Sequence, residues 1–161
     1  MSAWSKIRSQ FTLKRAKFLV YFYSTCYVIN KHFGELIICR GNSMLPTLKD
    51  GDWVIGERFT VAKGQLKIGD IVCSLSPVDP RVLLCKRIAF MGADKIEVDQ
   101  EYEAPLKRVP LGHCYLLGDN SAESQDSRHI GPVPVGLVQV KLSARVWPPS
   151  RIGWIEHHGS Q

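Results

Sequence analysis

The sequence lacks the short motifs that usually indicate a metal or a cofactor. It has no phosphate-binding loop, no dinucleotide fingerprint and no HExxH motif. Its five cysteines show no CxxC spacing, and their odd number and wide scatter indicate no disulfide framework. They stand at positions 26, 39, 73, 85 and 114. We therefore predict no metal and no cofactor, and we interpret the cysteines mainly as small buried apolar residues.

Acidic residues are absent from residues 1–17, which carry five basic residues. The chain has 21 basic residues in all, which leaves 16 against 15 acidic residues in the rest of the sequence. This nearly neutral remainder offers no footprint for phosphates, so we predict that nucleic acid is not a partner. The basic segment fits a targeting sequence or the positive flank of a membrane anchor.

Long hydrophobic runs are also missing. The aromatic-rich run from Phe18 to Ile29 has 12 residues, whereas a helix needs roughly 20 to cross a bilayer. Extending it from Ala16 to Phe33 adds polar residues that could snorkel at the two edges. We predict that residues 1–33 form a basic segment and one membrane-anchoring helix, with an amphipathic or buried helix as the alternative.

After residue 34, helical periodicity gives way to short segments rich in β-branched and aromatic residues, separated by Gly, Pro, Asp and Asn. These segments are residues 35–40, 53–58, 70–75, 81–90, 95–98, 113–117 and 137–147. They predict a mainly β domain over residues 34–148, an antiparallel β-sandwich or barrel. Residues 149–161 are expected to form a loosely held C-terminal tail.

The segment CRGNSMLPTL is suited to present a serine hydroxyl outside regular structure. Gly41 and Asn42 can adopt backbone angles that other residues avoid, and Pro46 fixes its own φ. A hydroxyl is a weak nucleophile until a base takes its proton. Ser43 is therefore a candidate nucleophile if the rest of the chain supplies that base.

Lys86 is the candidate base. Strand alternation in VLLCKRIAF places it on one face with Val82, Leu84 and Ile88, and places Arg87 on the other face. One of the two cations must lean toward the apolar side. If it is Lys86, desolvation lowers its pKa toward neutrality, and a neutral amine can act as a general base. The alternative is an edge-strand lysine with its amine in water.

The polar turn GDNSAESQDSR follows an apolar strand. It is either a plain surface loop or a set of groups that support the site. In the second interpretation, the Ser124 hydroxyl orients a buried amine without fixing it in its charged form. Asp126 can pair with Arg128 to hold the loop, and Asp119 can pair with Arg128 or Arg87.

Taken together, these elements resemble the type I signal peptidases, which are membrane-anchored Ser/Lys proteases. The matching segments, in the order of the family, are GNSMLPTLKDGDWV at 41–54, IGDIV at 68–72, LLCKRI at 83–88 and GDNSAESQDSRHIGPVP at 118–134. Each is weak alone, but the set is highly specific and covers roughly residues 34–148. The resemblance implies the signal peptidase catalytic fold with one N-terminal membrane-anchoring helix.

The resemblance also implies roles for single residues. Ser43 would be the nucleophile, Lys86 its general base, and Ser124 the residue that positions the lysine. The polar residues that would brace the site are Asp119, Asp126 and Arg128. The Ser43 backbone N–H would form half of an oxyanion hole. Some members take the second donor from a hydroxyl two residues earlier, where this chain has Gly41 and offers only a backbone N–H.

Within the family, the short chain leaves no room for the large β insertion of many bacterial enzymes. Its segments GPVP-x-GL and ARVWPPS most resemble mitochondrial inner membrane proteases of the subunit 1 type, followed by the subunit 2 type. This implies a place at the inner membrane with the catalytic domain facing the intermembrane space. It also implies a sister catalytic subunit as partner and precursor polypeptides with sorting signals as substrates.

Other interpretations stay open at this point. A Ser-His-Asp triad would need His113 or His129 as base, and Leu45 stands where a G-x-S-x-G elbow has its second glycine. A self-cleaving repressor would need a DNA-binding domain before the β region. A non-catalytic, membrane-anchored β module would need neither Ser43 nor Lys86. A Ser/Lys signal peptidase outside mitochondria would keep both residues.

Overall fold

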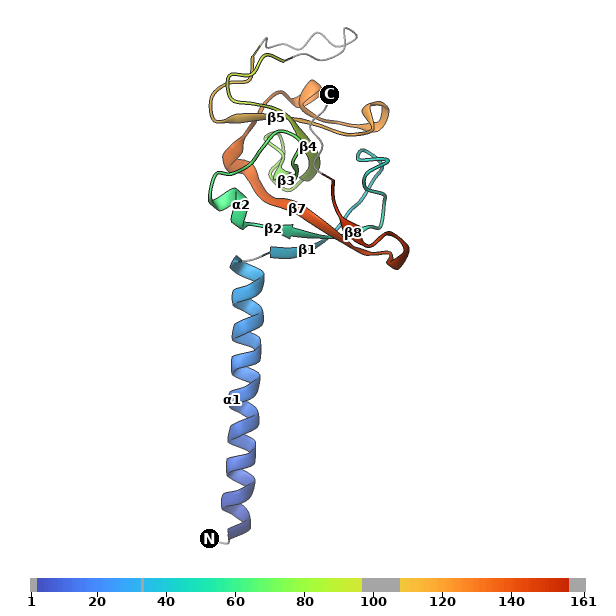
Figure 1. Cartoon of the computed structure of the whole chain (residues 1–161). Helices are drawn as coiled ribbons and strands as arrows, with labels where there is room; N and C mark the ends of the chain where they lie inside the picture. The colour runs from blue at the N-terminus through green and yellow to red at the C-terminus, as the bar shows by residue number, and fades with distance from the viewer. Residues whose placement is uncertain (1–2, 33, 97–107, 157–161) are drawn as a thin grey trace. The chain divides into compact units, whose positions relative to one another are not determined.

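The computed structural model of the chain describes residues 3–32, 34–96 and 108–156. By its internal contacts the chain divides into two compact units, residues 1–33 and 34–161. The first unit is a single helix, α1 (Ala3–His32), which runs without interruption (Figure 1). Among the described helices, none combines the length and the apolar character that crossing a membrane requires. The predicted N-terminal helix is therefore present, and its anchoring role stays a prediction.

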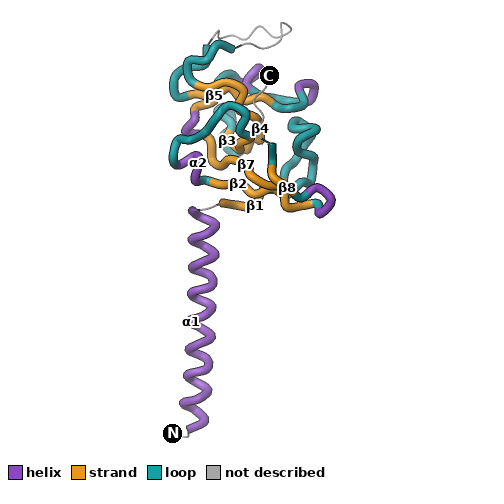
Figure 2. The backbone as a smooth tube through the Cα atoms, in the orientation of Figure 1, coloured by secondary structure: helices purple, strands orange, loops and turns teal. Residues whose placement is uncertain are grey.

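The second unit is built on one antiparallel sheet of eight strands that curls into a half-barrel (Figures 1 and 2). The strands are β1 (Gly34–Ile38), β2 (Trp53–Glu57), β3 (Ile71–Leu75), β4 (Leu83–Met91), β5 (His113–Leu117), β6 (Val133–Pro134), β7 (Val138–Trp147) and β8 (Gly153–Trp154). Their order is β1-β2-β7-β3-β4-β5-β6, with β8 beside β7. The predicted mainly β, antiparallel class is confirmed, whereas the sandwich alternative is wrong because a single sheet holds all eight strands.

Short helical turns fill the connections between these strands. They are α2 (Phe59–Ala62), η1 (Ser121–Glu123), α3 (Ser127–Ile130), η2 (Val135–Leu137) and η3 (Pro149–Arg151). Register shifts between β2 and β7, between β3 and β7 and between β4 and β5 let the sheet bend, because an extra residue on one strand increases its local twist. The predicted strand at 95–98 is reduced to a bridge between Lys95 and Arg108, and residues 97–98 lie outside the described part of the chain.

The core lies on both faces of the sheet. Val72 and Cys73 are neighbours on β3, so their side chains point to opposite faces, and both are buried. Cys73 packs with Met44, Leu48 and other residues in one cluster, while Val72 packs in the second. A strand buried on both faces is a rigid base, and β3 pairs directly with β4, which carries Lys86.

The residues that follow Pro148 do not form the loosely held end that we expected. β8 pairs with β7, and Ile155 is buried in the same core cluster as Met44. Arg151 forms an ion pair with the buried Asp52 at 3.0 Å. These contacts attach the segment that follows Pro148 to the sheet. The local sequence pattern gave no sign of them. Residues 157–161 lie outside the described part.

The five cysteines are free. Three of them, Cys39, Cys73 and Cys114, are buried, and Cys85 is partly buried, as a small apolar residue would be. Cys26 on α1 is exposed, so our interpretation is wrong there.

Candidate active site

Ser43 lies in a compact turn between β1 and β2. The turn is closed by backbone bonds from Leu45 N to Asn42 O (3.1 Å) and from Leu48 N to Met44 O (2.8 Å). Met44 and Leu48 are buried and anchor the turn to the core. Gly41 has a φ of 84°, a value that a residue with a Cβ rarely adopts. The local sequence thus fixes the backbone on either side of the serine.

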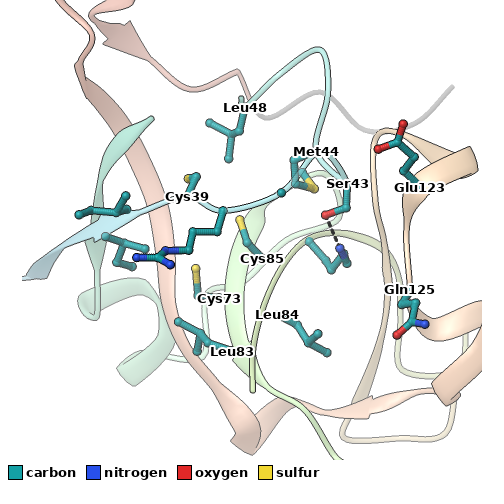
Figure 3. A pocket seen from close by; sticks show the side chains of 15 residues that line it. Cys39, Ser43, Met44, Leu48, Cys73, Leu83, Leu84, Cys85, Glu123 and Gln125 are labelled. Atoms are coloured by element: carbon teal, nitrogen blue, oxygen red, sulfur yellow. Dashed lines mark hydrogen bonds between the residues drawn. The ribbon is translucent and has the colours of Figure 1, made fainter. Parts of the chain in front are cut away.

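Lys86, and not Arg87, is the cation that β4 turns toward the interior. The Lys86 side chain is buried, with 5% of the residue exposed, and its Nζ lies 2.5 Å from Ser43 Oγ, to which it donates a hydrogen bond (Figure 3). Burial lowers the pKa of Lys86 below its ordinary value of 10.5, against the opposing influence of Cys85 and Asp126. A buried amine in direct contact with a serine hydroxyl can exchange a proton with it.

Ser124 lies close to Ser43. It is buried, and a hydrogen bond from its hydroxyl helps to lower the pKa of Asp126. The backbone of Gly118 passes so close that a Cβ there would collide with both the Ser124 side chain and the Ser43 carbonyl oxygen. The three residues therefore meet at one point, and a glycine is required for this close approach.

This close approach gives a test of the packing. We expect Gly118→Ala to destabilise the fold by about 1–3 kcal/mol, because the added methyl group forces backbone or side chains apart in a filled region. It should also lower turnover, since Ser43 must shift. Gly136→Ala is the matched control, because a Cβ at Gly136 meets nothing within 4 Å. Thermal unfolding of both variants measures the difference, and equal melting temperatures would contradict the contact.

Asp126 and Arg128 form the buried ion pair that the sequence suggested. Arg128 Nε and Nη2 donate to the two carboxylate oxygens at 2.9 and 2.8 Å, and Gly118 N–H donates at 3.0 Å. Asp126 is completely buried. Burial alone would raise the pKa of Asp126, but the donors from Arg128 and Gly118 hold it below its ordinary value. The carboxylate is thus kept charged and fixes the turn that carries Ser124.

Asp119 pairs with Arg87 and not with Arg128, which settles the two possibilities left by the sequence. Arg87 Nε and Nη2 donate to its two oxygens at 2.8 and 2.7 Å. The Thr47 hydroxyl donates to the same carboxylate at 2.5 Å. The backbone N–H of Asn120 donates a hydrogen bond to the Ser43 carbonyl oxygen at 3.0 Å. The polar turn therefore holds from one side the segment at residues 39–48, which carries the predicted nucleophile Ser43 and is called the nucleophile segment below.

The backbone donors near Ser43 differ from the expectation in one respect. Among the described residues, the Ser43 N–H has no assigned acceptor, as an oxyanion donor requires. The Gly41 N–H, in contrast, already donates to Asp50 Oδ1 at 2.8 Å. The Asp50 carboxylate thus occupies the Gly41 N–H in this arrangement, and the second oxyanion donor that the sequence left open stays a prediction.

Sequence reasoning missed a second group of residues that hold the nucleophile segment from behind. Arg145 Nη1 donates to the Thr47 carbonyl at 2.8 Å, and Arg151 Nη2 donates to it at 3.3 Å. Both guanidinium groups also contact Asp52, and Lys49 N–H donates to Asp52 at 2.9 Å. The partners are about a hundred residues apart, so no local pattern could reveal them. The one sign of this group in the sequence was Asp52, an acidic residue that follows a glycine in GDWV.

A cavity with a volume of about 460 Å³ opens beside Ser43 and Lys86 (Figure 3). Most of its wall is apolar and comes from β1, the nucleophile segment, β3 and β4. Cavities of this size hold ligands as large as a few peptide residues. A serine and an amine in contact at the edge of such a cavity, on a half-barrel sheet, are features of the serine peptidases.

Comparison with known proteins agrees with this class. The family model described as signal peptidase, peptidase S26, matches residues 12–104 and 99–147. Mitochondrial inner membrane protease subunit 1 of Mus musculus is 36% identical over 127 residues, covering 78% of this chain and 76% of that protein. The subunit 1 of Schizosaccharomyces pombe is 40% identical over 122 residues, covering 74% and 78%. Subunit 2 of Saccharomyces cerevisiae is 36% identical over 132 residues, covering 78% and 75%.

The chain belongs to the peptidase S26 family of signal peptidases. It is a signal peptidase-like serine protease of the mitochondrial inner membrane.

Proposed function

We propose that this chain is a serine endopeptidase in which Ser43 and Lys86 form a catalytic dyad. The proposal rests mainly on the 2.5 Å contact between Lys86 Nζ and Ser43 Oγ, with the lysine buried. The lowered pKa of Lys86 increases the neutral fraction of the amine, which is the form that can accept a proton. No histidine is needed in this scheme.

The reaction is acyl transfer in two halves. Neutral Lys86 takes the Ser43 proton while Oγ attacks the scissile carbonyl carbon, and the Ser43 N–H donates to the developing oxyanion. Protonated Lys86 then gives its proton to the departing amine, which leaves an acyl-enzyme on Ser43. A water molecule attacks the ester, again with Lys86 as base, and this restores the free serine and releases the acid.

Supporting roles follow from the same geometry. The Ser124 hydroxyl, which is buried beside Asp126, is proposed to hold the amine of Lys86 through a neutral contact. Asp126 and Arg128 fix the turn that carries Ser124, and Asp119 fixes the nucleophile segment through Thr47. These residues act by positioning the dyad.

The substrates that we propose are precursor polypeptides with sorting signals, cleaved on the intermembrane-space side of the inner membrane. The relatives are named as subunits 1 and 2 of an inner membrane protease, which supports a sister catalytic subunit as partner. α1, with its basic start, is proposed to anchor the chain at the membrane.

The proposed function is tested by reconstituting the full chain, alone and with a sister subunit, and incubating it with a precursor that carries a sorting signal. We expect cleavage at one site, identified by N-terminal sequencing of the product, and no cleavage by Ser43→Ala. Cleavage that persists in Ser43→Ala, either alone or with a sister subunit whose own nucleophile is replaced, would overturn the assignment of the nucleophile. A folded chain that binds the precursor but leaves it intact under both conditions would favour the non-catalytic β module.

A further inference from the structure

The cavity beside Ser43 has two charged side chains at its boundary that the proposed reaction does not use. They are Arg40, three residues before the serine, and Glu123, at the end of η1. Both are exposed and both line the cavity. Lys86 is the third basic or acidic residue of the wall, and burial disfavours its charged form. Arg40 and Glu123 are therefore the exposed charges around an otherwise mainly apolar space.

Unlike most arginines of the second unit, Arg40 forms no ion pair with a described residue. The arginines of this unit that form ion pairs are Arg58, Arg81, Arg87, Arg128, Arg145 and Arg151. The nearest acids in the sequence are occupied elsewhere: Glu35 by Arg58, Asp50 by the Gly41 N–H, and Asp52 by Arg145 and Arg151. An exposed guanidinium at the edge of a peptide-sized cavity is available to an external anion.

The backbone that carries Arg40 is held on both sides. Cys39 N–H donates to the Asp52 carbonyl at 2.8 Å, and the Cys39 carbonyl accepts from Gly51 N–H at 2.9 Å. On the other side, Gly41 N–H donates to Asp50 at 2.8 Å. A charge on a fixed backbone loses less freedom when it binds a ligand, so it discriminates better than a charge on a mobile loop.

Glu123 lies across the cavity mouth on a different segment. Figure 3 shows its carboxylate at the side of the cavity formed by the turn after β5, near Ser43. Among the described residues it forms no ion pair. A peptide in the cavity thus meets a cation from the nucleophile segment and an anion from the polar turn.

We propose that Arg40 determines specificity by binding an acidic side chain of the substrate near the scissile bond. Glu123 repels the same side chain, so the two charges together fix the direction and register in which the peptide lies. This inference rests on the proposed function, because it assumes that the cavity holds the substrate peptide.

The test measures peptide binding in the Ser43→Ala background, with a sister subunit whose own nucleophile is replaced as well, so that turnover cannot interfere. Fluorescent peptides that span a cleavage point are made in pairs, with glutamate or glutamine at successive positions on both sides of the scissile bond. Affinity is measured by fluorescence anisotropy at low and high salt for the full chain with its sister subunit. Arg40→Gln is compared with Arg81→Gln, which removes the same charge at an exposed position outside the cavity.

At one position we expect the glutamate peptide to bind about fivefold more tightly than its glutamine partner, a typical size for a partly exposed charge pair. This ratio should fall to about one in Arg40→Gln, persist in Arg81→Gln and shrink at high salt, because salt screens exposed charges. A ratio that is the same in Arg40→Gln and Arg81→Gln would overturn the inference. Cleavage by the parent enzyme in the same preparation would then show that the proposed function still stands.

Discussion

Replacing Lys86 by methionine is expected to lower the rate of precursor cleavage by about 10²–10⁴-fold, the usual contribution of a general base. Methionine keeps most of the buried length of the side chain but cannot accept the proton of Ser43, whose Oγ lies 2.5 Å from Nζ in the parent. Single-turnover cleavage in the presence of a sister subunit whose own nucleophile is replaced measures the loss. A variant that cleaves as fast as the parent would show that Lys86 is structural, and His113 and His129 would again be candidate bases.

The same variant should remain folded and at least as stable as the parent at neutral pH. The pKa of Lys86 is lowered by burial, so the unfolded chain binds more protons than the native one between the folded pKa and the ordinary value of 10.5. In the parent, stability therefore rises with pH across that window and is lowest where the buried amine is charged. Lys86→Met removes this dependence, and thermal unfolding at several pH values separates lost catalysis from lost folding.

The pH dependence of the rate follows from the same group. Only neutral Lys86 is a base, so kcat/KM should rise with pH and level off above the lowered pKa of Lys86. A rate that is constant from about pH 6 to 9 would contradict the dyad. The acid limb of the profile gives the pKa of Lys86 in the free enzyme. It therefore measures how far burial lowers that pKa.

Replacing Asp126 by alanine is expected to cost about 3–5 kcal/mol of folding free energy, the usual penalty for leaving a buried charge without its partner. Asp126 is fully buried, and its loss removes the carboxylate that balances the Arg128 charge and accepts the Gly118 N–H. Cleavage should be lost as well, because the turn that carries Ser124 loses its support. Denaturant unfolding measures the change in stability.

The matched control is Asp79→Ala, which breaks an ion pair with Arg81 at the surface. Its melting temperature should stay close to that of the parent, since exposed pairs contribute little. Equal effects of the two substitutions would show that the Asp126–Arg128 pair does not hold the fold. In the parent, the contribution of Asp126 is present above its ordinary pKa of 3.8 and is lost as the pH falls through the lower folded value.

Several features of this site follow from local sequence. The strand pattern gave β5 at the same residues as the structure and β3 within one residue, because alternation and flanking turn residues are local signals. The same alternation showed that Lys86 and Arg87 point to opposite faces. The pairing of Asp126 with Arg128 was also visible, since two residues in one turn are close whatever the fold.

Other features depend on which distant segments meet, and only the tertiary structure decided them. Lys86 is the buried cation because β4 lies beside β3, which is buried on both faces. Asp119 forms an ion pair with Arg87 because β5 pairs with β4, and Arg128 pairs with Asp126 instead. The sheet curls into a half-barrel through register shifts that no alternation pattern records.

The sequence by itself determined the groups that the proposed chemistry uses: a serine on a constrained turn, a lysine in an apolar strand and a polar turn to support them. Their mutual geometry came from the fold. Ser43 and Lys86 are 43 residues apart and touch only because the antiparallel sheet brings β4 next to the turn between β1 and β2. The clamp of Thr47 by Arg145 and Arg151, and the use of the Gly41 N–H by Asp50, likewise arose from packing. Local propensity fixes which residues form strands and turns, whereas contacts between distant segments depend on sheet order and packing.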